Sequence, residues 1–179
     1  MPKGLERYDP VTIALHWAVA AAVLLQWVGG QTIDDFPRGP LRVDARSTHL
    51  VVGVLLAVLL LVRLGWRTTR GTRLPAASQG WLGALARAVH GLLYLTLATL
   101  LGLGLISEGL RGDSLFGLVK LPAFGPFEGE QRHAIAEQFI GYHNLAATVL
   151  LCLAGLHAGA ALIHHFLLKD NVLRRMAPR

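Results

Sequence analysis

Four apolar stretches, separated by polar segments, dominate the hydropathy pattern of this chain. They cover about residues 11–29, 48–64, 81–106 and 139–168. Each has roughly the 17–25 residues that a helix needs to cross the hydrocarbon core of a bilayer, and the last is longer. The run Val51–Val62 contains no polar side chain, which is not typical of a helix in a soluble bundle. The pattern therefore predicts an all-α membrane protein, a four-transmembrane-helix up-down bundle.

Turn-forming residues predict where these helices end. Pro10 suits the first turn of the first helix, and Gly29-Gly30 is expected to end it. The segment 36–40 predicts a turn before the second helix, at whose far end Arg63 can snorkel to the interface. The connection between the third and fourth helices is long, and Glu128–Gln138 is expected to form a separate short helix within it.

The composition agrees with one membrane unit. The chain has 179 residues, 53% hydrophobic and 16% charged, which predicts a single four-helix domain over residues 1–179. Glu6 and Asp9 interrupt the basic N-terminus, so the first apolar stretch is expected to be a retained helix rather than a signal peptide. The single Cys152 excludes an internal disulfide, and without a Cys-x-x-Cys-His motif no covalently attached haem is expected.

The formal net charge of +6 is divided unevenly between the two sides of the predicted bundle. The N-terminus, the 63–87 connection and the C-terminal tail hold 11 Lys/Arg and 3 Asp/Glu, whereas the segments 31–47 and 107–138 hold 6 and 8. The positive-inside bias predicts a multi-pass membrane protein with both termini and the 63–87 connection in the cytoplasm. The basic character then reflects topology and lipid contact, and no nucleic-acid partner is expected.

Four histidines in the apolar stretches fall at two depths. His143 and His157 are fourteen residues apart, about 21 Å along one helix and on nearly the same face. His49 matches the depth of His143 near the outside, and His16 matches His157 near the inside. Two stacked haems with bis-histidine ligation require such a set, and this ligation favours electron transfer.

The same histidines are open to two simpler roles. A single buried histidine is usually a packed residue that is hydrogen-bonded to a neighbour, and imidazole also suits zinc and copper. No carboxylate or thiol lies at the same depth, however, and two separated two-histidine sites suit tetrahedral zinc poorly. Since His90 also lies in the inner half of its helix, depth alone leaves it open as a rival to His16.

The remaining polar groups near the inner side predict a quinone site. His90, His164, His165 and Lys169 can hydrogen-bond a quinone carbonyl and relay protons, since histidine titrates near neutral pH. The alternative is that they are interfacial polar residues without a specific role.

Arginines near the helix ends are candidates for pairing with haem propionates. Arg46 and Arg42 are placed for the outer haem, and Arg7 and Arg87 for the inner one. Lipid headgroups would account for the same residues.

Several motifs together resemble the bacterial cytochrome b-561 family of dihaem membrane proteins over nearly the whole chain. They include residues 7–17 with His16, the Arg46-Ser-Thr-His49 start, His90-Gly-Leu-Leu-Tyr94, the His143-x13-His157 spacing, and His164-His165 before Lys169–Met176. The resemblance implies two haem b groups on His16, His49, His143 and His157. It also implies an inner-membrane location and electron exchange with ubiquinone.

This resemblance predicts an oxidoreductase that passes electrons from a periplasmic one-electron donor, superoxide in one member of the family, to ubiquinone. The segments expected outside have a net charge of −2, which does not attract an anionic donor over long range. Local positive charge at Arg38, Arg42, Arg46 or Lys120 would act over shorter distances. The alternative is a membrane-anchor cytochrome subunit that links a separate redox partner, such as a hydrogenase, to the quinone pool.

Overall fold

Four long helices form the molecule, and the computed structural model describes residues 7–75 and 79–178. The helices are α1 (Pro10–Thr32), α2 (Pro40–Thr69), α3 (Gly80–Arg111) and α4 (Gly129–Phe166). Short elements join them: η1 (Ile33–Asp35), the antiparallel strands β1 (Ser114–Leu115) and β2 (Val119–Lys120), and η2 (Leu173–Met176). All four helices are long and apolar enough to cross a membrane. The predicted four-transmembrane-helix bundle is confirmed.

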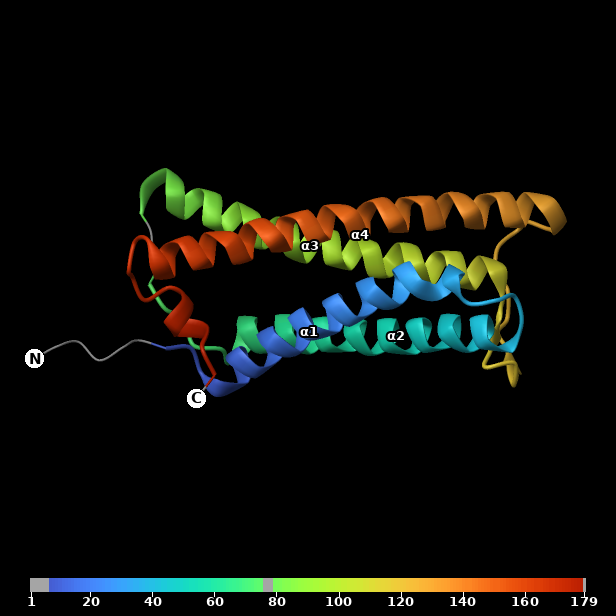
Figure 1. Cartoon of the computed structure of the whole chain (residues 1–179), viewed down its shortest axis with the longest axis horizontal. Coiled ribbons are helices and arrows are strands. Elements are labelled where there is room, and N and C mark those ends of the chain that lie inside the picture. The colour runs from blue at the N-terminus through green and yellow to red at the C-terminus, as the bar shows by residue number, and fades with distance from the viewer. Residues whose placement is uncertain (1–6, 76–78, 179) are drawn as a thin grey trace, which may run out of the picture.

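The helices run up and down, so the connections gather at two ends (Figure 1). One end holds the start of α1, the end of α2, the start of α3 and η2, and we call it the terminal end. The other holds η1 and the β1–β2 hairpin, and we call it the hairpin end. Each helix runs from one end to the other, so the depth of a residue can be given as its nearness to either.

The helices pack as two pairs, α1 with α2 and α3 with α4 (Figure 1). Where the pairs meet, a small apolar cluster of buried side chains fills the centre: Val19, Leu56, Leu60, Leu97 and Leu150. Large apolar side chains such as Leu25 and Leu61 point outward and are about 70% exposed, at 70% and 68%. Such a surface is costly in water and suits a lipid environment.

Three helix ends differ from the sequence-based expectation. The prediction that Gly29-Gly30 ends the first helix is wrong, because α1 continues to Thr32. The second helix starts at Pro40 and not at about residue 48. Proline suits a first-turn position, because no hydrogen-bonded N–H is needed there. The segment Glu128–Gln138 is not a separate helix, because α4 is continuous from Gly129. There the packing of α4 against α3 extends the helix, with Ala136 buried.

Asp9 organises the terminal end. Its carboxylate caps α1 by accepting hydrogen bonds from the N–H and hydroxyl of Thr12, at 2.9 and 2.7 Å. It also accepts from Trp66 Nε1 at 3.0 Å and from the Thr72 N–H at 2.9 Å, so it ties α1 to the end of α2. Burial works to raise the pKa of Asp9, but these hydrogen bonds outweigh it and hold that pKa well below its ordinary value.

The segment after α4 folds back under the terminal end. Trp17 Nε1 donates to the Met176 carbonyl oxygen at 2.8 Å, and the Tyr8 N–H donates to the Arg175 carbonyl oxygen at 3.1 Å. The Arg175 guanidinium in turn donates to the Pro75 carbonyl oxygen at 2.8 Å. The C-terminal segment thus holds the start of α1 and the α2–α3 connection together.

Candidate functional site

The structure brings the predicted histidine pairs together. The ring centroids of His49 and His143 lie 6.2 Å apart near the hairpin end, and those of His16 and His157 lie 6.3 Å apart near the terminal end. All four side chains are half-buried. The apolar cluster of Val19, Leu56, Leu60, Leu97 and Leu150 lies between the two levels in each helix. The chain therefore presents two similar sites separated by an apolar layer.

The spacing within each pair suits two imidazoles on opposite sides of one metal. An imidazole nitrogen lies about 2 Å from the metal it ligates, which places the ring centroids of two opposed ligands about 6 Å apart. His90 fits this geometry less well, since its ring centroid lies only 5.1 Å from that of His157. His90 is also exposed, unlike His16. The geometry favours His16 as the partner of His157.

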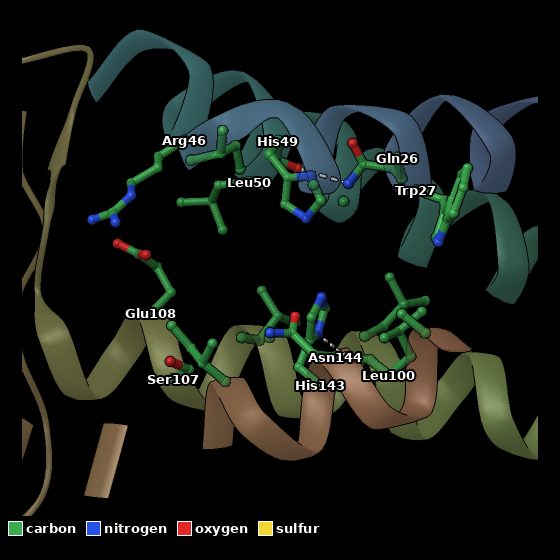
Figure 2. Close-up of a pocket in the computed structure, with 18 of the residues that line it drawn as sticks. Gln26, Trp27, Arg46, His49, Leu50, Leu100, Ser107, Glu108, His143 and Asn144 are labelled. Atoms are coloured by element: carbon green, nitrogen blue, oxygen red, sulfur yellow. Dashed lines mark hydrogen bonds between the residues drawn. The ribbon is translucent and has the colours of Figure 1, made fainter. Parts of the chain in front are cut away.

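A cavity of about 260 Å³ surrounds the pair at the hairpin end. His49 and His143 point toward each other across it (Figure 2). Apolar and polar side chains from all four helices line it, including Trp27, Leu50 and Asn144. A cavity between helix pairs with two opposed imidazoles is suited to a flat, largely apolar group held from both faces.

Hydrogen bonds fix the two histidines differently. His143 Nδ1 donates to the Leu100 carbonyl oxygen at 2.9 Å, which leaves the lone pair of Nε2 available to a metal. His49 Nδ1 is buried and has no hydrogen-bond partner among the described residues. The backbone at His49 is held instead, since Gln26 Nε2 donates to its carbonyl oxygen at 2.8 Å (Figure 2). The His49 ring is therefore positioned through its backbone, and no described side chain competes with a ligand for its ring nitrogens.

Two glycines make room for these rings. A Cβ at Gly30 would lie 3.2 Å from His49 Cε1, and a Cβ at Gly104 would lie 3.1 Å from His143 Cε1 and Nδ1. Both distances are shorter than ordinary van der Waals contact. Sequence reasoning missed these glycines, because they lie on the helices facing the histidines rather than beside them in the sequence.

Charged groups gather at the mouth of the cavity. Arg46 and Glu108 point toward each other there (Figure 2), and Arg111 and Asp113 also line it. Arg111 pairs with Asp113 at 2.9 Å, and Arg46 lies 4.0 Å from the same carboxylate. Arg46, expected as a propionate partner, is thus at the cavity; Arg111 was not anticipated.

Arg42, the other arginine expected at this end, serves the loop instead. It pairs with Asp34 at 3.3 Å and donates to the carbonyl oxygens of Asp34 and Phe36. It is not among the residues that line the cavity. The contacts of Arg42 hold η1 against the start of α2.

The terminal-end pair has a cation beside it. Arg63 Nη1 donates to His16 Nδ1 at 3.0 Å, and Arg63 Nε donates to the Tyr94 hydroxyl at 3.0 Å. The expectation that Arg63 snorkels to the interface is wrong, because its side chain turns to these partners and is half-buried. Hydrogen bonding to two polar side chains outweighs reaching the headgroups.

The expected quinone residues do not form one cluster. His164 Nδ1 hydrogen-bonds the Asp170 carboxylate at 2.5 Å, and His165 lies next along α4. Lys169 is exposed and has a left-handed φ of 52° in the turn that brings Asp170 back to His164. Burial raises the pKa of Asp170, but hydrogen bonds from His164 and the Val172 N–H outweigh it, so this pKa lies below its ordinary value.

His90, the remaining residue of the expected quinone site, lies beside His157 of the terminal-end histidine pair. No hydrogen bond or ring contact joins it to His164, His165 or Lys169 within residues 7–75 and 79–178.

The two arginines expected at the terminal-end haem are exposed. Arg7 precedes α1, and Arg87 lies in the first turns of α3. Among the described side chains neither makes an ion pair.

The described ranges contain no group of three or more histidine, cysteine, aspartate or glutamate side chains that would hold a metal ion by themselves. Paired imidazoles with an open space between them instead fit a metal whose other ligands come with a macrocycle. Fold and site together define the class: a multi-pass membrane protein with opposed histidines, as in membrane b-type cytochromes.

Comparison with known proteins gives the family. The profile described as prokaryotic cytochrome b561 matches residues 7–179, and the chain belongs to this family. A protein named probable superoxide oxidase CybB from Yersinia pestis is 30% identical over 178 residues, covering 97% of each chain. Cytochrome b562 from Cereibacter sphaeroides is 32% identical over 174 residues, covering 94% of each. Cytochrome b561 homolog 1 from Escherichia coli is 29% identical over 180 residues, covering 98% of this chain and 99% of the relative.

Membership has direct consequences. The protein is a membrane cytochrome of a prokaryotic family, its cofactor is haem b, and its role is electron transfer. The resemblance stated from the sequence motifs is confirmed.

Proposed function

We propose that the chain holds two haem b groups, one at each histidine pair. His49 and His143 would ligate the haem near the hairpin end, and His16 and His157 the haem near the terminal end. The observation that carries the proposal is the matching of the two ring separations, 6.2 and 6.3 Å, at levels about 21 Å apart along the helices. When bound, haem b would supply a one-electron carrier, and a histidine from each side would keep substrates away from its iron.

The surrounding residues would hold and orient each group. Leu100 fixes the His143 ring through its carbonyl oxygen, and Gln26 fixes the backbone of His49. Arg46 and Arg111 at the cavity mouth would bind the propionates, since guanidinium groups pair well with carboxylates. Arg7 and Arg87 remain candidates for the propionates at the other end.

The charge distribution supports one orientation in the membrane. The segments at the terminal end hold 11 Lys/Arg against 3 Asp/Glu, and those at the hairpin end hold 6 against 8. By the positive-inside bias, the terminal end would face the cytoplasm and the hairpin end the periplasm of a bacterial inner membrane.

With this orientation, the protein would take electrons from a periplasmic one-electron donor and deliver them to ubiquinone. Superoxide is the donor we propose, because a relative of similar length is named a probable superoxide oxidase. The balanced reaction converts two superoxide ions, one ubiquinone and two protons into two dioxygen molecules and one ubiquinol.

The protons of ubiquinone reduction need a source near the terminal end. His164 would donate from Nε2 to a quinone oxygen while the Asp170 carboxylate holds its Nδ1. His165 and Lys169 lie close in sequence and would complete the site, with His90 nearer the haem ligand His157.

A second function is a cytochrome b anchor that links a separate redox subunit to the quinone pool. It is favoured by the net charge of −2 on the hairpin-end segments, which does not attract an anion such as superoxide. A partner protein docked at the hairpin end would replace the small donor.

Superoxide-driven ubiquinone reduction by the purified chain separates the two functions. Turnover by the isolated protein, lost in His49→Ala and in His157→Ala, is the result expected for the oxidase. No turnover without co-purified subunits would favour the anchor. His133→Ala makes the same substitution at an exposed position of α4 that does not line the cavity, and it is the matched control for the variants.

A further inference from the structure

Arg63 occupies on α2 the position that a ligand occupies on α4. It follows His49 by fourteen residues, as His157 follows His143. Fourteen residues span about 21 Å and return to nearly the same helix face. Arg63 therefore lies on α2 at the depth of the second histidine pair, although it is a cation and not a ligand.

The side chain is fixed at that depth by two contacts from other helices. Its Nη1 donates to His16 Nδ1 on α1 and its Nε donates to the Tyr94 hydroxyl on α3, both at 3.0 Å. The guanidinium carbon also lies 5.5 Å from the centroid of the Tyr94 ring, within cation–π range. A neutral His16 that ligates a metal through Nε2 carries its proton on Nδ1 and no longer accepts from Arg63, so the contacts with Tyr94 are the ones that keep the guanidinium at this depth.

No carboxylate of residues 7–75 and 79–178 pairs with this charge. Within the described part of the chain, Arg63 makes no ion pair, whereas Arg42, Arg46 and Arg111 at the hairpin end all lie within 4.0 Å of Asp34 or Asp113. An arginine side chain stays charged at any accessible pH. Among the described residues, the terminal-end site therefore contains a fixed positive charge without an ion-pair partner, and the hairpin-end site does not.

We propose that Arg63 is a positioning residue that raises the reduction potential of the terminal-end haem above that of the hairpin-end haem. The inference rests on the proposed two-haem function. Reducing a haem removes one positive charge from it, so a nearby fixed cation favours the reduced form, and it does so strongly where water is excluded. The effect makes electron transfer from the hairpin end to the terminal end favourable, and so sets its direction.

Redox titration of purified Arg63→Gln, followed by haem absorbance, tests the proposal. We expect the reduction equilibrium of one haem to shift at least tenfold toward the oxidised form, which is 59 mV for a one-electron couple. The other haem should shift less than threefold. Arg63→Lys keeps the charge and should restore most of the difference.

Control variants exclude a general effect. Arg70→Gln removes a charge about two turns further on, at the exposed C-cap of the same helix, and should leave both haems within threefold of wild type. Repeating Arg63→Gln in a His49→Ala protein assigns the shift, because only the terminal-end haem should then remain. Tyr94→Phe removes the hydroxyl that accepts from Arg63 Nε, and it should shift the reduction equilibrium of the same haem in the same direction by less than Arg63→Gln does.

Each outcome decides for or against the proposal. If Arg63→Gln binds two haems with unchanged potentials, or if Arg63→Lys shifts as far as Arg63→Gln, the role of Arg63 is contradicted. If Arg63→Gln does not bind the terminal-end haem, the reduction potentials of Arg63→Lys and Tyr94→Phe decide instead. A wild-type-like potential in Arg63→Lys with a lowered one in Tyr94→Phe supports the proposal, and an unchanged potential in Tyr94→Phe contradicts it. If the wild-type protein binds fewer than two haems, the proposed function fails instead, and haem analysis alone shows it.

Discussion

Gly104 gives the sharpest test of how the hairpin-end site is built. An added Cβ would lie 3.1 Å from two atoms of the His143 ring, whereas ordinary van der Waals contact begins at 3.4 Å. The ring cannot retreat freely, because its Nδ1 is bonded to the Leu100 carbonyl oxygen. Gly104→Ala must therefore displace the His143 imidazole or the helix that carries it.

The size of the effect follows from the packing. Overpacking a filled interior by one methyl group costs about 1–3 kcal/mol. If that cost falls on haem binding, the affinity at this site drops by about five- to a hundredfold, since 1.4 kcal/mol is tenfold. The alanine also gains helix propensity, about 1 kcal/mol relative to glycine, which partly masks the loss in thermal stability.

Gly102→Ala is the matched control. It lies two residues away on α3, and a Cβ there would meet no atom within 4 Å. The helix-propensity gain is the same for both variants, so it cancels in their comparison. The assays are the haem-to-protein ratio, the haem spectrum and thermal unfolding in detergent. Equal haem content, spectrum and unfolding temperature in the two variants would refute the close contact between Gly104 and His143.

Three further changes probe other parts of the molecule. Asp9→Asn should lower the free energy of unfolding by about 1–2 kcal/mol in thermal unfolding at neutral pH. Because the pKa of Asp9 is depressed in the folded protein, this advantage of wild type is complete above about pH 5 and shrinks as the pH falls below about 4. A stability difference that grows in acid would contradict this role of Asp9. Gln26→Leu removes the hydrogen bond to His49 and should cost about 1 kcal/mol and shift the spectrum of one haem only, and a change in both would count against a local role. Asp170→Asn should slow ubiquinone reduction by about tenfold or more while leaving haem content unchanged, since His164 loses the carboxylate that holds its Nδ1, and an unaltered rate would exclude this pair from proton delivery.

The sequence predicted the fold well, because bilayer thickness fixes the length of an apolar helix. Helix ends were less predictable. Gly29-Gly30 is a stop signal in isolation, but the helix continues, and the His49 ring lies against these two residues. The length of α4 depends on packing against α3, with Ser107 donating to the Ala136 carbonyl oxygen, and no local pattern encodes that contact.

The candidate site was predictable in part. Depth matching named pairs that the structure places 6.2 and 6.3 Å apart, and their ligation of haem stays a prediction. Depth could not separate His16 from His90, because both lie near the terminal end. The distances of their ring centroids from that of His157, 6.3 and 5.1 Å, and the greater burial of His16 distinguish the two in the structure. The cross-helix partners, Gly104 and Arg63 above all, were beyond reach, since a single sequence does not say which residues of different helices face each other.

The haem-to-protein ratio in wild type, His49→Ala and His157→Ala, measured with the low-spin haem spectrum, tests the central claim most directly. Two bis-histidine sites predict two low-spin haems per chain in wild type and one in each variant, with different spectra for the two that remain. One haem in the wild-type protein, or a variant that keeps both, would contradict the pairing of these four histidines.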